Sequence, residues 1–187
     1  DGNVYVTGYF KHSFTLDAYG GGTIVINEVG GGDYDIFTIG FNQDGEALWG
    51  RVDGGTKDDS GLSIVATATK IAVLGYFEND ETTLCDIIPT QNTGTTDYCV
   101  MTFDYAGNPL WFSTWGSSMD DFNTSSNYID QRPSLGNCGE ELYAIGASMG
   151  SIAPFLVLVI PLFLPSTWQV LTPGLICLPW HGMLMVV

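Results

Sequence analysis

Apolar and polar residues alternate along short runs of the chain. Residues 3–10 are NVYVTGYF and residues 35–41 are DIFTIGF, and similar runs cover residues 62–69, 71–77, 98–104 and 110–115. A period of two is typical of strands with one buried face. No stretch keeps the period of an amphipathic helix, so the pattern predicts an all-β protein.

Two phrases of this pattern recur. NVYVTGYF returns as KIAVLGYF at residues 70–77 and more weakly as ELYAIGAS at residues 141–148. The phrase DIFTIGFNQDGEALWGRVDGGTKDD, at residues 35–59, lines up with YCVMTFDYAGNPLWFSTWGSSMDD at residues 98–121. Such repetition indicates units that bury their apolar faces against neighbouring units. We expect a single domain with units at about 1–60, 61–121 and 122–187.

Each long phrase contains a short turn between two strand-like runs. Gly45 ends the turn of the first phrase, and Gly107 takes its place in the second. A tight hairpin turn needs positive φ, which glycine adopts without strain. Repeated groups of four antiparallel strands, with no room for crossover helices, are typical of β-propeller blades. Closed propellers have about four to eight blades. The three visible units, the first of which begins at a second strand, therefore predict a partial ring.

The order GNVYVTGYF, an acidic Gly-rich loop, DIFTIGFNQDGEALW and GGTKDD resembles the bacterial SBBP-type β-propeller repeat family. Members of that family read approximately GNVYVTGY…DAFVAKLDxDGxLLW…GGSGDD. The resemblance covers about residues 1–148 and is thinner at residues 141–148. It implies a propeller fold and an exported or surface-exposed bacterial protein. The family has no shared catalytic motif, so the resemblance informs fold and location far more than activity.

Charge narrows the range of partners. The chain has 21 Asp and Glu against 5 Lys and Arg, a net charge of -16. Such a surface repels nucleic acid phosphates and anionic membranes, so we expect no nucleic-acid partner and no membrane insertion. The four cysteines (Cys85, Cys99, Cys138 and Cys177) lack CxxC spacing and give little support to a zinc site. Cys85 and Cys99 flank a loop and are either bridged, in an exported protein, or free thiols.

The C-terminal tail has a different composition. No charged residue follows Glu141, and the run IAPFLVLVIPLFLP at residues 152–165 is interrupted by prolines. It is shorter than the roughly 20 residues of a membrane helix. One interpretation of residues 152–187 is a buried strand pair or an assembly contact. The other is a frame shift, because moving the frame of residues 180–187 back by one base admits Leu-Ala-Trp-Asp-Ala-Asp-Gly-Gly, which is similar to the GFNQDGE hairpin.

Paired carboxylates are the candidate metal ligands. Asp58 and Asp59 follow the last strand of one unit, and Asp120 and Asp121 follow that of the next. Carboxylates in a loop can hold calcium, which takes about six to eight oxygen ligands. The structural alternative is that they accept backbone N–H bonds in the turn to the next unit. No EF-hand spacing accompanies them. The segment around Asp33 and Asp35 allows the same two interpretations.

Nothing in the sequence singles out a catalytic group. His12 and His181 are the only histidines, and no Ser, His and Asp grouping can be assembled with any specificity. We therefore expect no catalytic residue and no cofactor other than calcium. Trp49 and Trp111 occupy equivalent positions, which indicates core packing between units, with sugar stacking as the lesser alternative.

Together these features predict a non-catalytic structural and binding module of adhesion type, outside the cell or at the bacterial cell surface. Its partner would be a protein or a glycan, contacted by the loops Lys11–Val29 and Glu78–Asp97, which differ most between units. Two alternatives remain. One is a propeller enzyme acting on polysaccharide. The other is a self-associating subunit of a surface filament, in which the apolar tail is an interface.

Overall fold

The computed structural model describes residues 2–31, 33–78, 82–89, 95–116, 133–146 and 156–160. Every regular element among these residues is a β-strand, which confirms the predicted all-β class. No helix of the length and apolarity needed to cross a membrane occurs in this part of the chain. The strands are β1 (Val4–Phe10), β2 (Phe14–Asp17), β3 (Thr23–Ile26), β4 (Asp35–Phe41), β5 (Ala47–Asp53), β6 (Ser60–Ala66), β7 (Ile71–Phe77), β8 (Asp97–Phe103), β9 (Pro109–Trp115), β10 (Ser134–Cys138), β11 (Glu141–Gly146) and β12 (Leu156–Ile160).

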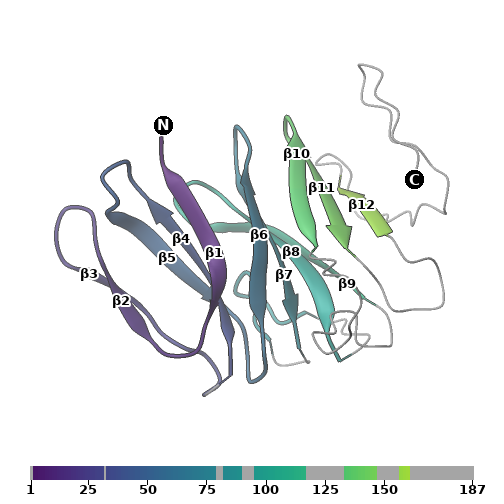
Figure 1. Cartoon of the computed structure of the whole chain (residues 1–187), viewed down its shortest axis with the longest axis horizontal. Helices are drawn as coiled ribbons and strands as arrows, with labels where there is room; N and C mark the ends of the chain where they lie inside the picture. The colour runs from purple at the N-terminus through teal and green to yellow at the C-terminus, as the bar shows by residue number, and fades with distance from the viewer. Residues whose placement is uncertain are drawn as a thin grey trace.

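The strands form antiparallel sheets that follow one another along the chain. Sheet 1 has the order β1-β4-β5, sheet 2 the order β6-β7-β8-β9 and sheet 3 the order β10-β11-β12, and β2 and β3 form a separate hairpin. Figure 1 shows sheets 1, 2 and 3 side by side in chain order. This arrangement is a partial, propeller-like stack of blades, with the full complement of four strands in sheet 2.

The sequence repeat corresponds to a structural repeat. Gly8 of β1 pairs with Phe37 of β4, and Gly75 of β7 pairs with Cys99 of β8. The bulge between β4 and β5 lies at Gly40/Phe41, and the bulge between β8 and β9 lies at the matching step, Thr102/Phe103. Sheet 1 therefore matches the last three strands of sheet 2 in register. Among the described residues, no strand of sheet 1 corresponds to β6.

The predicted turn glycines have the backbone conformation that the turns require. Gly45 has φ of 81° and Gly107 has φ of 83°. In each turn the glycine N–H donates to the carbonyl oxygen three residues earlier, that of Asn42 or Asp104. The side chain of that residue also accepts backbone N–H bonds of the same turn. A left-handed glycine and an Asx side chain thus close both hairpins, as the Gly-based prediction required.

Two apolar cores lie between the sheets. Ile36 of sheet 1 packs with buried residues of sheet 2 that include Val73 and Phe77. On the other side of sheet 2, Leu74 and Val100 pack with Leu142 of sheet 3. The alternation along β7 sends Val73 to one core and Leu74 to the other. Each sheet therefore covers an apolar face of its neighbour, as the repeat predicted.

The segment Lys11–Val29, which we expected to form a contact loop, contains the β2–β3 hairpin. Its apolar face packs on sheet 1 around Ile26 and Ile39. Gly50 of β5 makes room for it, since a Cβ at this position would lie 2.4 Å from Cδ1 of Ile26. One face of the hairpin is thus part of the core, while its other face and its turn are exposed.

The repeated tryptophans pack between sheets, as predicted. The indole of Trp49 stacks on Tyr5 and donates from Nε1 to the carbonyl oxygen of Tyr105, in the β8–β9 turn of sheet 2. Trp111 packs against the core between sheets 2 and 3. Trp115, for which the sequence allowed exposure, is half-buried and stacks on Tyr98.

Sheet 3 includes part of the apolar tail. β12 pairs antiparallel with β11, from Gly146↔Leu156 to Leu142↔Ile160. It occupies the third position of its sheet, as β8 does in sheet 2 when counted from β6. The rest of residues 152–187, on which the frame-shift and assembly-contact hypotheses depend, lies outside the described residues.

Candidate functional site

Three buried aspartates lie at one end of sheets 1 and 2. Asp35 begins β4, Asp53 ends β5, and Asp59 directly precedes β6. Because β4 and β5 are antiparallel, with Ile36 opposite Asp53, the first residue of one strand lies beside the last residue of the other. The exposed fractions of Asp35, Asp53 and Asp59 are 0%, 1% and 0%. We call these three residues the acidic seam.

Each carboxylate of the acidic seam holds a backbone N–H with one oxygen. Asp35 Oδ2 accepts from the N–H of Val29 at 2.7 Å, and Asp53 Oδ1 accepts from that of Cys85 at 2.7 Å. Asp59 Oδ1 accepts from the N–H of Glu78 at 3.0 Å, and the hydroxyl of Thr82 lies 3.4 Å away. The second oxygen of each carboxylate is buried and has no hydrogen-bond partner among the described residues.

Asp35 and Asp59 converge on the same backbone segment. The N–H of Gly55 lies near both carboxyl groups and lowers both pKa values, while Asp35 raises the pKa of Asp59 through charge repulsion. The neighbouring residue, Gly54, is packed against Asp35: a Cβ there would lie 2.2 Å from Asp35 Oδ1. The Gly-Gly pair therefore permits two carboxyl groups to approach one stretch of backbone.

Burial raises the pKa values of the acidic seam. Desolvation is the largest cause for all three groups, because a charged carboxylate loses more hydration free energy than a neutral carboxyl group on leaving water. It raises the pKa of Asp59 to about 8, that of Asp53 to about 6, and that of Asp35 above its ordinary value. The guanidinium of Arg51 partly offsets the effect on the pKa of Asp53. A buried carboxyl group with a pKa of about 8 is largely protonated at neutral pH.

The second element of the site is the segment Thr82–Ile88, which we call the clamped loop. It belongs to the connection between β7 and β8, but it is attached to the end of β5. Gly54 and Thr83 exchange two backbone hydrogen bonds, of 3.0 and 2.8 Å. Arg51 Nη2 lies 2.8 Å from Asp86 Oδ1, while Asp53 holds the N–H of Cys85. Sheets 1 and 2 are therefore joined here by polar contacts as well as by their core.

The clamped loop is strained and carries exposed apolar side chains. Cys85 and Asp86 have φ of 52° and 65°, in the left-handed region that costs a non-glycine residue about 1–2 kcal/mol. The contacts of Asp53 and Arg51 hold this conformation. Ile87 and Ile88, which follow directly, are 57% and 56% exposed. Two exposed apolar side chains are therefore attached to a held backbone in the segment Glu78–Asp97, where the sequence predicted partner contacts.

The predicted metal ligands fall partly within this site. Asp58 Oδ1 accepts from the N–H of Tyr34 at 3.2 Å, and Asp59 accepts from that of Glu78, which is the structural alternative raised above. Asp120 and Asp121 lie outside the described residues. In the part of the chain that the structure describes, no group of three side chains is suited to hold a metal ion. A calcium ion at Asp35 and Asp59 would need further ligands from backbone oxygens and water.

The sequence predicted Asp59 as a candidate metal ligand and allowed the same role for Asp35. It did not predict that these two residues lie close together, and it did not identify Asp53 at all. One signal was available. Asp97 occupies in β8 the place of Asp35 in β4 and is also buried, at 2% exposure. A repeated aspartate at the start of the same strand indicates a repeated structural role. Asp53 has no such signal, because Trp115 takes its place in the next unit.

The remaining sequence candidates are the cysteines and the two histidines. Cys85 and Cys99 are buried free thiols and Cys138 is an exposed one, so the first two are not bridged. Desolvation raises the pKa of Cys85 to about 12 and that of Cys99 well above its ordinary value, which keeps both thiols protonated and weakly nucleophilic. His12 is exposed, with Nδ1 4.0 Å from Glu28 Oε2. His181 lies outside the described residues.

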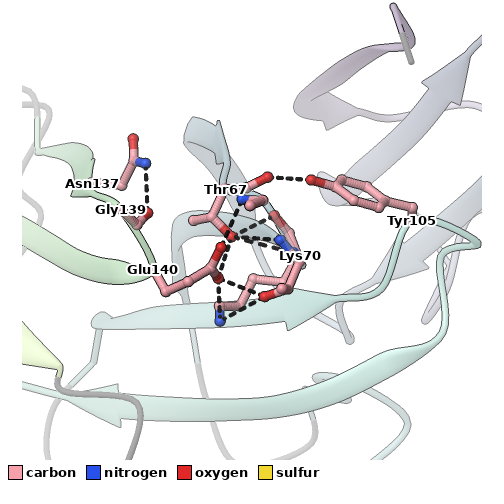
Figure 2. Close-up of polar contacts among 8 residues, drawn as sticks. Thr67, Lys70, Tyr105, Asn137, Gly139 and Glu140 are labelled. Carbon is pink, nitrogen blue, oxygen red and sulfur yellow. Dashed lines mark hydrogen bonds and ion pairs between the residues drawn. The ribbon is translucent and has the colours of Figure 1, made fainter.

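A polar network lies at the other end of the sheets, the end that carries the hairpin turns (Figure 2). Glu140, in the β10–β11 turn of sheet 3, accepts from the hydroxyl of Thr67 and the N–H of Ala68, and pairs with Lys70 Nζ at 3.0 Å. The hydroxyl of Tyr105 donates to the carbonyl oxygen of Thr67. Since Trp49 of sheet 1 donates to the carbonyl oxygen of Tyr105, one chain of contacts crosses all three sheets.

Replacement of Glu140 by Gln is expected to lower the melting temperature modestly, on the order of 2 °C. Hydrogen bonds from Thr69, Thr67 and Lys70 lower the pKa of Glu140 to about 2. The stabilisation is therefore present above the ordinary pKa of 4.5 and is lost as the pH falls through 2. Thermal melts of Glu140→Gln and wild type should differ at pH 7 and converge near pH 2. Glu141→Gln removes the same charge next door and serves as the control; an equal effect there would contradict the assignment.

Comparison with protein-family models and with curated proteins finds no match to this chain.

Proposed function

We propose that the chain is a non-catalytic structural and binding module, part of a β-propeller displayed outside the cell or at the bacterial cell surface. The observation that carries this proposal is the position of its acidic groups. The carboxyls with raised pKa values are buried and hold backbone N–H groups of the neighbouring loops. A polysaccharide in solution does not contact them in this conformation. The resemblance of residues 1–148 to the SBBP-type repeat supports the location.

The clamped loop is the proposed contact surface. Ile87 and Ile88 project from a backbone that is fixed by Asp53 and Arg51. Apolar side chains on a rigid support lose little conformational entropy on binding, which favours affinity. The net charge of -16 disfavours acidic partners. A protein or glycan partner with an apolar patch and a neutral or basic surround fits this surface.

The double substitution Ile87→Ser and Ile88→Ser is expected to weaken binding at least about tenfold, because two exposed apolar anchors are lost. The protein would be applied to immobilised peptidoglycan, cellulose, chitin and a panel of extracellular matrix proteins, and its retention measured. Leu110→Ser is the control, since Leu110 is similarly exposed, at 52%, but belongs to β9 and not to the loop. Equal retention of the double variant and of wild type on every surface that binds would contradict the assignment of the loop.

The enzyme alternative rests on the raised pKa of Asp59, a property that general acids share. The same incubations separate it from the proposal. We expect retention on a surface without release of reducing sugar. Release of reducing sugar by wild type that disappears in Asp59→Asn would replace the binding module with a polysaccharide-acting enzyme.

We also propose calcium as the ion with which the acidic seam is compatible. Asp35 Oδ1 and Asp59 Oδ2 are buried without a hydrogen-bond partner among the described residues, and hard oxygen donors suit this cation. A proton shared between the two carboxyl groups satisfies the same oxygens. Unfolding measured over a range of pH, with and without calcium, distinguishes the ion from the proton.

A further inference from the structure

Two valines of β1 are exposed where their counterparts in the repeat are buried. Val4 is 53% and Val6 38% exposed, whereas Ile71 and Val73, at the matching positions of β7, are both 0% exposed. The two strands have the same length and pair in the same register with the next strand, β4 or β8. The difference therefore comes from what covers each strand.

The strand β7 has a neighbour on the side where β1 has an edge. Ile64 of β6 pairs with Val73, and Ala66 pairs with Ile71. Among the described strands, β4 is the sole hydrogen-bonded neighbour of β1. An edge strand presents unpaired N–H and C=O groups that accept another strand. The edge of β1 and its two valines thus correspond to the place that β6 fills in sheet 2.

The β2–β3 hairpin limits what can occupy this place. It covers the face of sheet 1 that carries Ile39 and Phe41, where a preceding blade would otherwise pack. Its outward residues Thr15, Asp17, Thr23 and Val25 are exposed, and three of these four are polar. Polar outer faces are typical of the terminal units of repeat stacks. The hairpin leaves Val4 and Val6 exposed beside the free edge of β1, where one added strand would cover them.

The opposite face of β1 is already occupied by sheet 2. A Cβ added at Gly61 of β6 would lie 2.2 Å from the hydroxyl of Thr7 and 3.1 Å from the backbone N and O of Gly8. Thr7 and Val6 point to opposite faces, since side chains alternate along a strand. An incoming strand must therefore lie along the free edge and on the Val4–Val6 side.

We propose that the free edge of β1 binds one extended strand with the pattern of β6, the first strand of another repeat unit. The strand runs antiparallel to β1 and places one apolar residue over Val6, as Ile64 lies opposite Val73 in sheet 2. Backbone hydrogen bonds supply affinity and the alternate side chains supply specificity, as in strand addition to a sheet edge. The inference rests on the proposed binding role of the chain, but it uses a different surface from the clamped loop.

The test uses a fluorescent peptide with the sequence of residues 59–67, DSGLSIVAT, titrated with the full chain and followed by fluorescence anisotropy. We expect saturable binding that is weakened at least about tenfold by Val6→Arg, because a charge would be placed in the apolar strip. Val25→Arg is the matched control, since Val25 is 52% exposed on the hairpin, and should bind as wild type does. The double variant Val4→Ser with Val6→Ser gives the same readout with a smaller effect on the fold.

Absence of peptide binding by wild type, or equal binding by Val6→Arg and Val25→Arg, would overturn the inference. Concentration-dependent dimerisation that Val6→Arg abolishes, without peptide binding, would overturn the proposed occupant and identify a second copy in its place. Neither result affects the retention assay with Ile87 and Ile88. Failure of that assay with the peptide result intact would count against the clamped loop alone.

Discussion

At pH 9 the Asp59→Asn variant is expected to be more stable than the wild-type protein. Asp59 is fully buried, and its pKa is raised from 3.8 to about 8 in the folded chain. The folded state therefore binds a proton that the unfolded state has lost between these pH values. Such a group contributes its full stability below pH 3.8, and this contribution is lost as the pH rises through 8. A difference of one between the folded and unfolded pKa values corresponds to about 1.4 kcal/mol of stability.

Asparagine removes this dependence while keeping the acceptor. Its Oδ1 can still accept from the N–H of Glu78. Its NH2 group takes the place of Oδ2, which has no hydrogen-bond partner among the described residues, and introduces a donor near the carboxylate of Asp35. The free energy of unfolding, measured by urea denaturation from pH 4 to pH 9, should fall by several kcal/mol for wild type and much less for the variant. A residual slope is expected from Asp53 and Asp35, whose pKa values are also raised.

The control is Asp58→Asn, which removes the neighbouring, half-buried carboxylate, an acceptor for the N–H of Tyr34. It should keep the wild-type slope. An unchanged slope in Asp59→Asn would show that Asp59 does not carry the proton. The same titration in excess calcium and in EDTA tests the ion: a bound calcium would keep Asp35 and Asp59 ionised, raise stability with calcium concentration and remove the slope. Equal curves in calcium and EDTA would exclude a stabilising calcium ion at the seam.

Substitution of Gly61 by Val is expected to destabilise the chain by about 3 kcal/mol, because the backbone of β1 cannot make room for the added side chain by a small adjustment. The added Cβ would lie 2.2 Å from Thr7 Oγ1 and 3.1 Å from the backbone N and O of Gly8. The Thr7 hydroxyl donates to the carbonyl oxygen of Phe37 at 2.9 Å, so it is not free to move. The contact between sheets 1 and 2 would have to open.

The matched control is Gly136→Val in β10, where an added Cβ has no heavy atom within 4 Å among the described residues. It should change stability by less than about 1 kcal/mol. Both variants are measured by urea unfolding. Combining Gly61→Val with Thr7→Ala should recover part of the loss, since it removes one of the clashing groups but leaves the backbone of Gly8 in place. Similar stabilities of Gly61→Val and Gly136→Val would contradict the close approach of β1 and β6.

The sequence predicted the strands well because the signals for them are local. The period of two marks the faces of β7, and Gly45 and Gly107 mark hairpins that need positive φ. The repeat extended these signals, so that a match between two phrases predicted equivalent strands. Trp49 and Trp111 were assigned to the core by the same argument. Each of these inferences uses residues within one unit, or the same residue in two units.

The acidic seam and the hairpin were less accessible to this reasoning. Asp35, Asp53 and Asp59 come from three segments that meet only when β4, β5 and β6 are in place. The segment Lys11–Val29 was interpreted as a contact loop because it differs between units. Its alternation of Phe14, Leu16, Ile24 and Ile26 is short, and only the packing on sheet 1, with Ile26 above Gly50, shows that these side chains face the core.

By itself, the sequence determined the strand-rich class, the repeated unit, the turns and the strongly acidic surface, because each of these depends on residue type and spacing along the chain. The tertiary structure decided which carboxyl groups lose contact with water, where the loop carrying Ile87 and Ile88 is fixed, and which edge of sheet 1 is left without a neighbour. Burial and pairing depend on distances between segments far apart in the chain, and those distances are set by how one sheet packs on the next.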